Sequence, residues 1–175
     1  YNNETYDNTT KYQIFSKSGN ALSSITEFNS SVQTAVAYNM DTTVLENGNV
    51  VVSFNAITTA PGSDLRVYKQ LFDASGNQIG NTARVTEYEG SYVERDSQVV
   101  SLPNAEFIIV FGQTYSNKIQ AQRFDSFGNK VGDIINISYN DSVLHVVGND
   151  QYDVIALDDT TLVASWYTRS IGGGN

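Results

Sequence analysis

The sequence predicts an all-β protein with three internal repeats of about four strands each and an orphan strand at its N-terminal end. Two linked patterns that each recur three times support this prediction, and no window of useful length shows a convincing helical period. The chain has 175 residues, of which 40% are hydrophobic. That size and composition suit one domain with a buried core.

The first pattern is Gln-x-Phe-x-x-x-Gly-Asn-x-aliphatic. It begins at Gln13, recurs 57 residues later at Gln70, and recurs 52 residues after that at Gln122. Each copy predicts a strand that ends in a tight turn. In that turn an Asp or Ser oxygen can accept backbone N–H groups, and Gly can adopt a positive φ. Each copy therefore predicts one hairpin.

The second pattern is a Leu followed by apolar residues at positions +5, +7 and +9. It starts at Leu45, Leu102 and Leu157, with short turn-like segments after each Leu. The apolar sets are Val50, Val52 and Phe54; Phe107, Ile109 and Phe111; and Leu162, Ala164 and Trp166. A spacing of two predicts strands with one buried face, so the aromatic residue of each set is predicted to lie in the core.

We expect a polar N-terminal arm at residues 1–10, a single β-repeat domain at 11–168, and a flexible Gly-rich tail at 169–175. The repeat units are expected at about 11–66, 67–118 and 119–168. Three units are too few for one chain to close into a propeller, which typically has about four to eight blades. Propeller-like blades, or one threefold barrel, are the alternatives for the fold.

The two ends of the chain break the repeat in complementary ways. Inside the chain each Leu hairpin is followed by a Gln-x-Phe strand, but no such strand follows Trp166. Conversely, the strand Lys11–Phe15 has no preceding hairpin. An open sheet edge is prone to association. The first strand can complete the last unit of the same chain or that of a neighbour, or the chain can be a part of a longer repeat array.

Composition and charge argue against several functions. The chain has 10 basic and 19 acidic residues, a net charge of −9, which argues against nucleic acid as a partner. Its longest strongly apolar run, residues 107–111, is far shorter than the roughly 20 residues that span a bilayer. Cysteine is absent, so thiolate catalysis and Cys-zinc sites are excluded. We expect no cofactor and no metal.

Candidate chemical groups have simpler structural explanations. His145, the only histidine, lies in an apolar stretch and is expected on a half-buried strand. The acidic residues are expected to be solvated loop charges, although paired carboxylates could serve glycoside chemistry or bind calcium. The two acidic groups are Glu87, Glu89, Glu94 and Asp96, and Asp150, Asp153, Asp158 and Asp159. Five tyrosines outside the repeats are candidates for sugar contacts: Tyr88, Tyr92, Tyr115, Tyr139 and Tyr152.

The polar, weakly charged composition, with 11 Tyr, indicates an extracellular or cell-surface protein. Five Asn-x-Ser/Thr sequons provide candidate N-glycosylation sites, at Asn3, Asn8, Asn29, Asn136 and Asn140.

The repeated Leu-x-x-Gly-x-Val-Val-x-aromatic and Gln-x-Phe-Asp-x-x-Gly-Asn-x-Val-Gly motifs resemble repeats in very large secreted and surface proteins of bacteria and ciliates. The resemblance covers most of residues 11–168. It implies an extracellular β-repeat with an adhesive or surface-layer role and brings no catalytic residue. The chain departs from the motif at Ser16, Ser23, Phe54 and Phe111.

We therefore expect a non-enzymatic structural subunit of an extracellular filament or surface assembly whose partner is a second copy of itself. The assembly strand would be Lys11, Tyr12, Gln13, Ile14 and Phe15. It would complete the acceptor unit formed by Leu157, Leu162, Ala164 and Trp166 of a neighbour. A carbohydrate-binding adhesin or lectin-like module is the alternative, and a glycoside-active enzyme is the third hypothesis.

Overall fold

The computed structural model describes residues 11–27, 34–58, 64–87, 93–113, 118–138, 152–158 and 160–167. Within these ranges the protein is all-β, as predicted, and its one helical element is the 3-10 turn η1 (Pro103–Ala105). No helix in these ranges is long and apolar enough to cross a membrane. Predictions for the N-terminal arm and the Gly-rich tail lie outside the described residues. So do those for Asn3, Asn8, Asn29, Tyr88, Glu89, Tyr92, Tyr115, Tyr139, Asn140, His145, Asp150 and Asp159.

Two antiparallel four-stranded sheets form the middle of the molecule. The first sheet has the order β3 (Thr34–Val44), β4 (Val50–Thr58), β5 (Arg66–Phe72), β6 (Gln78–Arg84). The second has the order β7 (Glu94–Ser101), β8 (Phe107–Gln113), β9 (Lys118–Phe124), β10 (Lys130–Asn136). In each sheet the Leu hairpin supplies the first two strands and the Gln-x-Phe hairpin supplies the last two.

Two short hairpins make up the rest of the described fold. At the N-terminal end β1 (Lys11–Tyr12) pairs with β2 (Thr26–Glu27). At the C-terminal end β11 (Tyr152–Ala156) pairs with β12 (Leu162–Trp166). The expected strand Lys11–Phe15 is regular only over its first two residues, and Phe15 forms an isolated bridge with Ala21.

The expected three four-stranded units within one chain are not confirmed, because two sheets have four strands and two have two. Each four-stranded sheet also crosses an expected unit boundary, at residue 66 or 118, because a Gln-x-Phe strand pairs with the Leu hairpin before it. None of the four sheets described closes into a barrel, and they do not form a propeller.

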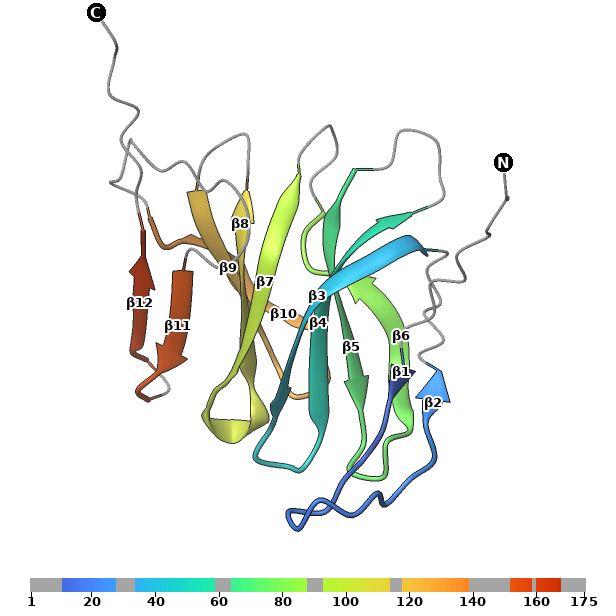
Figure 1. Ribbon diagram of the computed structural model, residues 1–175. Coiled ribbons are helices and arrows are strands. Elements are labelled where there is room, and N and C mark those ends of the chain that lie inside the picture. The colour runs from blue at the N-terminus through green and yellow to red at the C-terminus, as the bar shows by residue number, and fades with distance from the viewer. Residues whose placement is uncertain are drawn as a thin grey trace, which may run out of the picture.

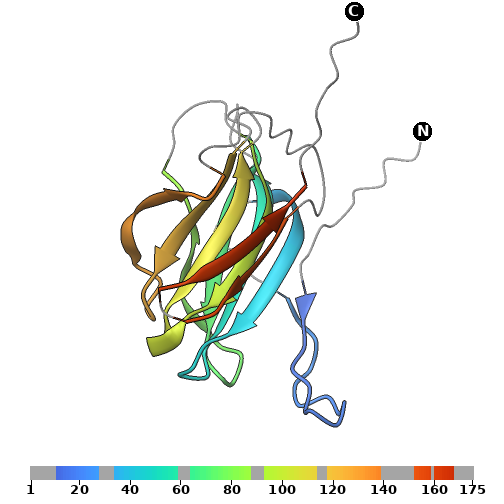
Figure 2. The ribbon, with the colours of Figure 1, turned by 90° about the vertical axis from the view of Figure 1, so that its left-hand side faces the viewer.

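The sheets are stacked face to face, with the two short hairpins on opposite sides of the stack (Figure 1). A turned view shows the β11–β12 hairpin lying across the outer face of the second sheet (Figure 2). One apolar cluster, including Val51, Leu71, Phe107 and Phe124, fills the space between the two large sheets. A second cluster, including Ile108, joins the second sheet to the β11–β12 hairpin.

The three Gln-x-Phe turns share one hydrogen-bond pattern. The N–H of Asn77 donates to Asp73 Oδ1 at 2.8 Å, and the N–H of Asn129 donates to Asp125 Oδ1 at 2.8 Å. In the N-terminal hairpin the N–H of Asn20 donates to the hydroxyl oxygen of Ser16 at 3.0 Å. The hydrogen bonds from Asn77 hold the pKa of Asp73 below its ordinary value. The hydroxyl of Ser16 thus replaces the carboxylate as the turn acceptor.

The glutamine of each motif ties its strand to the next one. Gln70 and Gln122 are buried, and their Nε2 groups donate to the carbonyl oxygens of Gly80 and Gly132 at 3.4 and 3.2 Å. Gln13 Nε2 donates to the carbonyl oxygen of Ser23, the matching position, at 2.9 Å. The motif therefore specifies the same local contact in all three hairpins.

Candidate assembly surfaces

The N-terminal hairpin rests on the turn between β5 and β6. The Tyr12 hydroxyl donates to the carbonyl oxygen of Gly76 at 2.6 Å, and the Tyr12 ring lies 5.0 Å from that of Phe72. A Cβ atom at Gly76 would lie 2.7 Å from Ile14 Cδ1, and Gly76 has a φ of +86°. The positive φ therefore favours glycine at this turn, and the terminal methyl of Ile14 packs closely against it.

The same contact occurs between the two large sheets. A Cβ atom at Gly128, in the β9–β10 turn, would lie 3.2 Å from Leu71 Cδ1 and 3.0 Å from Lys69 Nζ. In the Gln-x-Phe motif Ile14 matches Leu71, and Gly76 matches Gly128. The β1–β2 hairpin thus sits against the first sheet as the β5–β6 hairpin sits against the second.

The C-terminal hairpin is anchored on the second sheet through β11. Tyr152 is buried, and its hydroxyl donates to the carbonyl oxygen of Asp96. Gln98 Nε2 donates to the carbonyl oxygen of Tyr152 at 3.0 Å. Strand β12 pairs with β11 on one side, and no described strand pairs with its other edge. The matching strands β4 and β8 have a partner on both edges.

Matching side chains differ sharply in exposure between the large sheets and the short hairpins. Phe72 and Phe124 are 4% and 0% exposed, whereas Phe15, at the same motif position, is 56% exposed. The first residue of the Leu motif shows the same difference. Leu45 and Leu102 are 2% and 5% exposed in the large sheets, whereas Leu157 in the C-terminal hairpin is 62% exposed.

The prediction that the aromatic residue of each Leu hairpin lies in the core is correct for Phe54 and Phe111 and wrong for Trp166. Phe54 and Phe111 are fully buried, whereas Trp166 is 37% exposed. Phe54 and Phe111 lie on strands with a partner on both edges, whereas among the described strands β12 has a partner on one edge. Leu162 and Ala164 are half-buried against the second sheet.

An apolar groove of 570 Å³ lies between β1 and the outer face of the first sheet. Its sheet wall is formed by side chains of β3 and β4, and its other wall by the N-terminal hairpin and the β5–β6 turn. The principal lining residues are Lys11, Ile14, Met40, Thr42, Val44, Val50 and Val52. Val44 is 62% exposed, so the groove leaves apolar side chains open to solvent.

This groove was not predicted from the sequence. Val50 and Val52 belong to a set predicted to be buried, but both are only half-buried, because no complete sheet covers the outer face of the first sheet. Met40 and Val44 continue the same alternation along β3 and could have indicated an apolar outer face.

The acidic residues that the structure describes make contacts within the fold. Glu94 is fully buried, contrary to the expectation of a solvated charge, because its Oε2 accepts the N–H of Val67 at 3.0 Å. Asp96 is buried too and accepts the amide of Asn39 at 3.0 Å. Glu87 is exposed and pairs with Lys130 at 2.7 Å. These contacts join strands and loops to each other.

A polar hollow of 430 Å³ lies where β3, β7 and β11 meet. Asp41, Asp96 and Asp153 line it. Asp41 Oδ2 accepts the N–H of Val99 at 2.8 Å, and Asp153 Oδ1 accepts the N–H of Val154 at 2.9 Å. Among the described residues, no three His, Asp or Glu side chains lie so that together they could hold a metal ion. The hollow is lined by hydrogen-bonded residues of three sheets.

Two further predicted contact residues have clear positions. Tyr152 is not a loop residue available to sugars, because it is a buried residue of β11. Asn136 is exposed at the end of β10, and its Oδ1 accepts the amide of Gln120 at 2.8 Å. Of the five sequons, this one has its acceptor Asn within the described residues.

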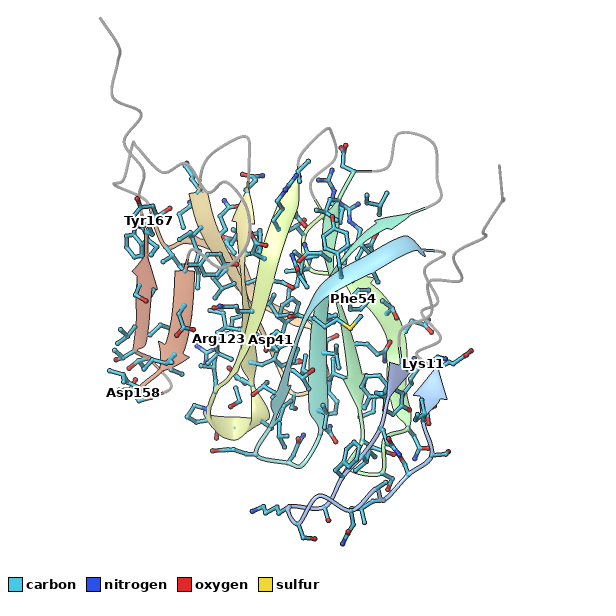
Figure 3. All side chains as sticks on the ribbon, viewed as in Figure 1. Lys11, Asp41, Phe54, Arg123, Asp158 and Tyr167 are labelled. Atoms are coloured by element: carbon cyan, nitrogen blue, oxygen red, sulfur yellow. The ribbon has the colours of Figure 1, made fainter. Side chains whose placement is uncertain are left out.

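The predicted assembly strand and the predicted acceptor unit lie far apart in the folded molecule. Lys11 on β1 and Asp158 in the β11–β12 turn are on opposite sides of the molecule (Figure 3).

A scan against protein-family models finds no family that matches this chain, and a search of curated proteins finds no match.

Proposed function

We propose that the protein is a structural subunit of an extracellular filament or surface assembly that grows head-to-tail. In this proposal β1 of one copy pairs with the open edge of β12 of its neighbour. The β11–β12 and β1–β2 hairpins of two copies then form a third four-stranded, blade-like unit. A contact between two different surfaces of the same chain propagates into a filament unless its rotation closes a ring.

The large sheets provide the register of the proposed pairing. In the first sheet Val50, Val52 and Phe54 pair with Phe72, Gln70 and Tyr68, and in the second sheet Phe107, Ile109 and Phe111 pair with Phe124, Gln122 and Gln120. Matching positions place Leu162 opposite Phe15, Ala164 opposite Gln13, and Trp166 opposite Lys11 of the neighbour. The pairing is antiparallel, as in both large sheets.

The observation that carries the proposal is the difference in exposure between matching residues. Phe124 is buried because it packs against Phe107, with ring centroids 5.1 Å apart. The proposed register puts Phe15 beside Leu162, which occupies the position of Phe107. Burying Phe15, Leu157 and Trp166 would provide an apolar driving force, and the new strand pair would add main-chain hydrogen bonds.

The extracellular part of the proposal depends on composition and on the resemblance to surface-protein repeats. The described residues add no catalytic arrangement that would favour a glycoside-active enzyme, and no observation on them favours a lectin over a structural subunit.

Cysteine cross-linking tests the register directly, because the natural chain contains no cysteine. The variant Ile14→Cys/Val163→Cys places the two thiols at positions that match the pairs Leu71–Val51 and Arg123–Ile108. Under mild oxidation we expect a ladder of covalent oligomers on a denaturing gel. The control Tyr12→Cys/Val163→Cys shifts one thiol by two residues and should cross-link several-fold more slowly. Equal rates for both pairs would contradict the proposed register.

Electron microscopy and sedimentation of the unmodified chain provide the second readout. We expect oligomers or filaments, together with a blue shift of Trp166 emission as the concentration rises, because Trp166 is the only tryptophan and is partly exposed in a single copy. Compact monomers at all concentrations, without cross-links between chains, would overturn self-assembly. Closure within one chain or pairing with further repeats of a longer protein would then explain the open edges.

A further inference from the structure

We infer that the apolar groove beside β1 is the docking site for the β11–β12 hairpin of a neighbouring copy. This inference rests on the proposed function and adds a second surface to it. Edge pairing would join β12 to β1 of the neighbour, and the groove would at the same time receive one face of the same hairpin. Each contact between subunits would then have a strand edge and a packed face.

The interface between the two large sheets provides the template. There the β3–β4 hairpin covers the second sheet, and Val51 of β4 is buried in a cluster with Val99 and Ile109. The matching residues on the outer face of the first sheet are Thr42 and Val52, which line the groove. The groove therefore lies where the missing first half of a covering sheet would sit.

The second half of that covering sheet is already in place. The β1–β2 hairpin occupies the position against Gly76 that the β5–β6 hairpin occupies against Gly128. A covering sheet whose second half is β1–β2 needs a Leu hairpin as its first half. Within one copy, β11–β12 is the Leu hairpin that lacks a Gln-x-Phe partner in the described structure. A second copy supplies that hairpin.

The hairpin presents a suitable face. Ile155 and Val163 are paired across β11 and β12 and are 53% and 46% exposed, on the face opposite the one that packs on the second sheet. Val163 matches Val51 of the template. Its burial against Thr42 and Val52 of the neighbour would remove apolar surface from water on both partners.

The charges of the two hairpins are of opposite sign. Residues 11–27 contain two Lys and one Glu, whereas residues 152–167 contain three Asp and no Lys or Arg. Lys11 lines the groove, and Asp153 lies on β11 of the incoming hairpin. Opposite charges on the two surfaces favour an encounter between the two ends of different copies over an encounter between like ends.

The test uses Ile155→Lys, because Ile155 lies on β11 and takes no part in the proposed edge pairing. It is exposed in a single copy, so the variant should fold as the natural chain does. A lysine buried in an apolar groove without a partner is unfavourable. We expect association measured by sedimentation to weaken on the order of tenfold or more. The control Thr160→Lys adds the same charge in the β11–β12 turn and should leave association nearly unchanged.

A compensating variant separates docking from a general charge effect. Thr42→Glu places a carboxylate in the groove, so the double variant Ile155→Lys/Thr42→Glu pairs the two charges at every contact and should associate several-fold more tightly than either single variant. If the natural chain assembles and cross-links in register but Ile155→Lys assembles equally well, groove docking is wrong and edge pairing stands. If the natural chain itself does not assemble, the proposed function fails before the groove is tested.

Discussion

The middle of the molecule and its two ends are built from the same motifs, but matching apolar side chains are buried in the middle and exposed at the ends. In the second sheet the hairpin that contains Gln122 and Phe124 lies beside a Leu hairpin, and both side chains are buried. At the N-terminal end the hairpin with Gln13 and Phe15 makes the same glutamine contact and turn, yet Phe15 stays exposed. Local contacts thus need no neighbour, whereas burial needs a second hairpin.

This difference separates two kinds of information in the motif. The turn residues and the glutamine specify the hairpin through contacts spanning at most ten residues. The apolar positions determine only which face of the hairpin can be buried. The hairpin that buries this face lies in another part of the sequence. The two short hairpins lie on opposite sides of the stack, so in the proposed assembly each gains that cover from another copy of the chain.

The largest expected effect comes from removing the N-terminal half of the proposed interface. Deletion of residues 1–27 should abolish assembly, because β12 then has no strand to pair with. No residue of 11–27 belongs to the apolar cluster between the two large sheets, so the truncated chain should still unfold cooperatively. Sedimentation and thermal circular dichroism measure both effects. Filaments formed by the truncated chain would show that assembly uses another surface.

Matched alanine variants at Phe124 and Phe15 test the role of burial. Phe124→Ala should lower the free energy of unfolding of the dilute monomer by about 3–5 kcal/mol, because it empties a fully buried site. Phe15→Ala should lower it by about 0.5 kcal/mol or less, as for an exposed residue. Phe15→Ala should weaken association between copies instead. Urea denaturation at low concentration measures the first quantity, and a large effect of Phe15→Ala there would mean that Phe15 is covered within one chain.

Alanine variants of the motif glutamines should differ less in their free energy of unfolding. Gln122→Ala removes a buried side chain whose amide donates to the carbonyl oxygens of Arg123 and Gly132 in a partly buried site, and should lower the free energy of unfolding by about 1–3 kcal/mol. Gln13→Ala removes the matching bond to Ser23 in a half-buried hairpin, where water can replace the donor, and should cost less than about 1 kcal/mol. Urea denaturation of the two variants at the same low concentration provides the comparison. Equal losses would indicate that the N-terminal hairpin is as protected as the second sheet.

Much of this fold could be predicted from sequence because the repeat is periodic. The alternation from Phe107 to Phe111 and the turn at Asp125 gave the strand and turn positions correctly. The prediction of a buried Trp166 was wrong because it relied on the match of its motif to Phe111 and did not take into account that no Gln-x-Phe strand follows Trp166. The burial of Glu94 was also not predicted, because its partner Val67 lies 27 residues earlier, on a different sheet.

The smallest expected effect concerns the turn acid that the N-terminal hairpin lacks. Hydrogen bonds from Asn77 hold the pKa of Asp73 below 3.8. A folded pKa below the unfolded one contributes stability at pH values above about 3.9, and that contribution is lost as the pH falls through the folded pKa. Ser16 occupies the matching position and carries no titrating group. Ser16→Asp should therefore tighten the turn at neutral pH and make it sensitive to acid.

Carboxyl titration by NMR checks this expectation. The carboxyl introduced at position 16 should titrate below its ordinary value, and exchange of the Gly19 amide, which donates to the carbonyl oxygen of residue 16 at 2.9 Å, should slow at neutral pH. The control Ser24→Asp adds the same charge to the same hairpin, at an exposed position outside the turn. Because residue 24 is not an acceptor of the turn, its carboxyl should titrate normally. Identical titration at both positions would mean that the N-terminal turn does not adopt the geometry of the turns in the large sheets, and the proposed pairing of Phe15 with Leu162 would lose its structural basis.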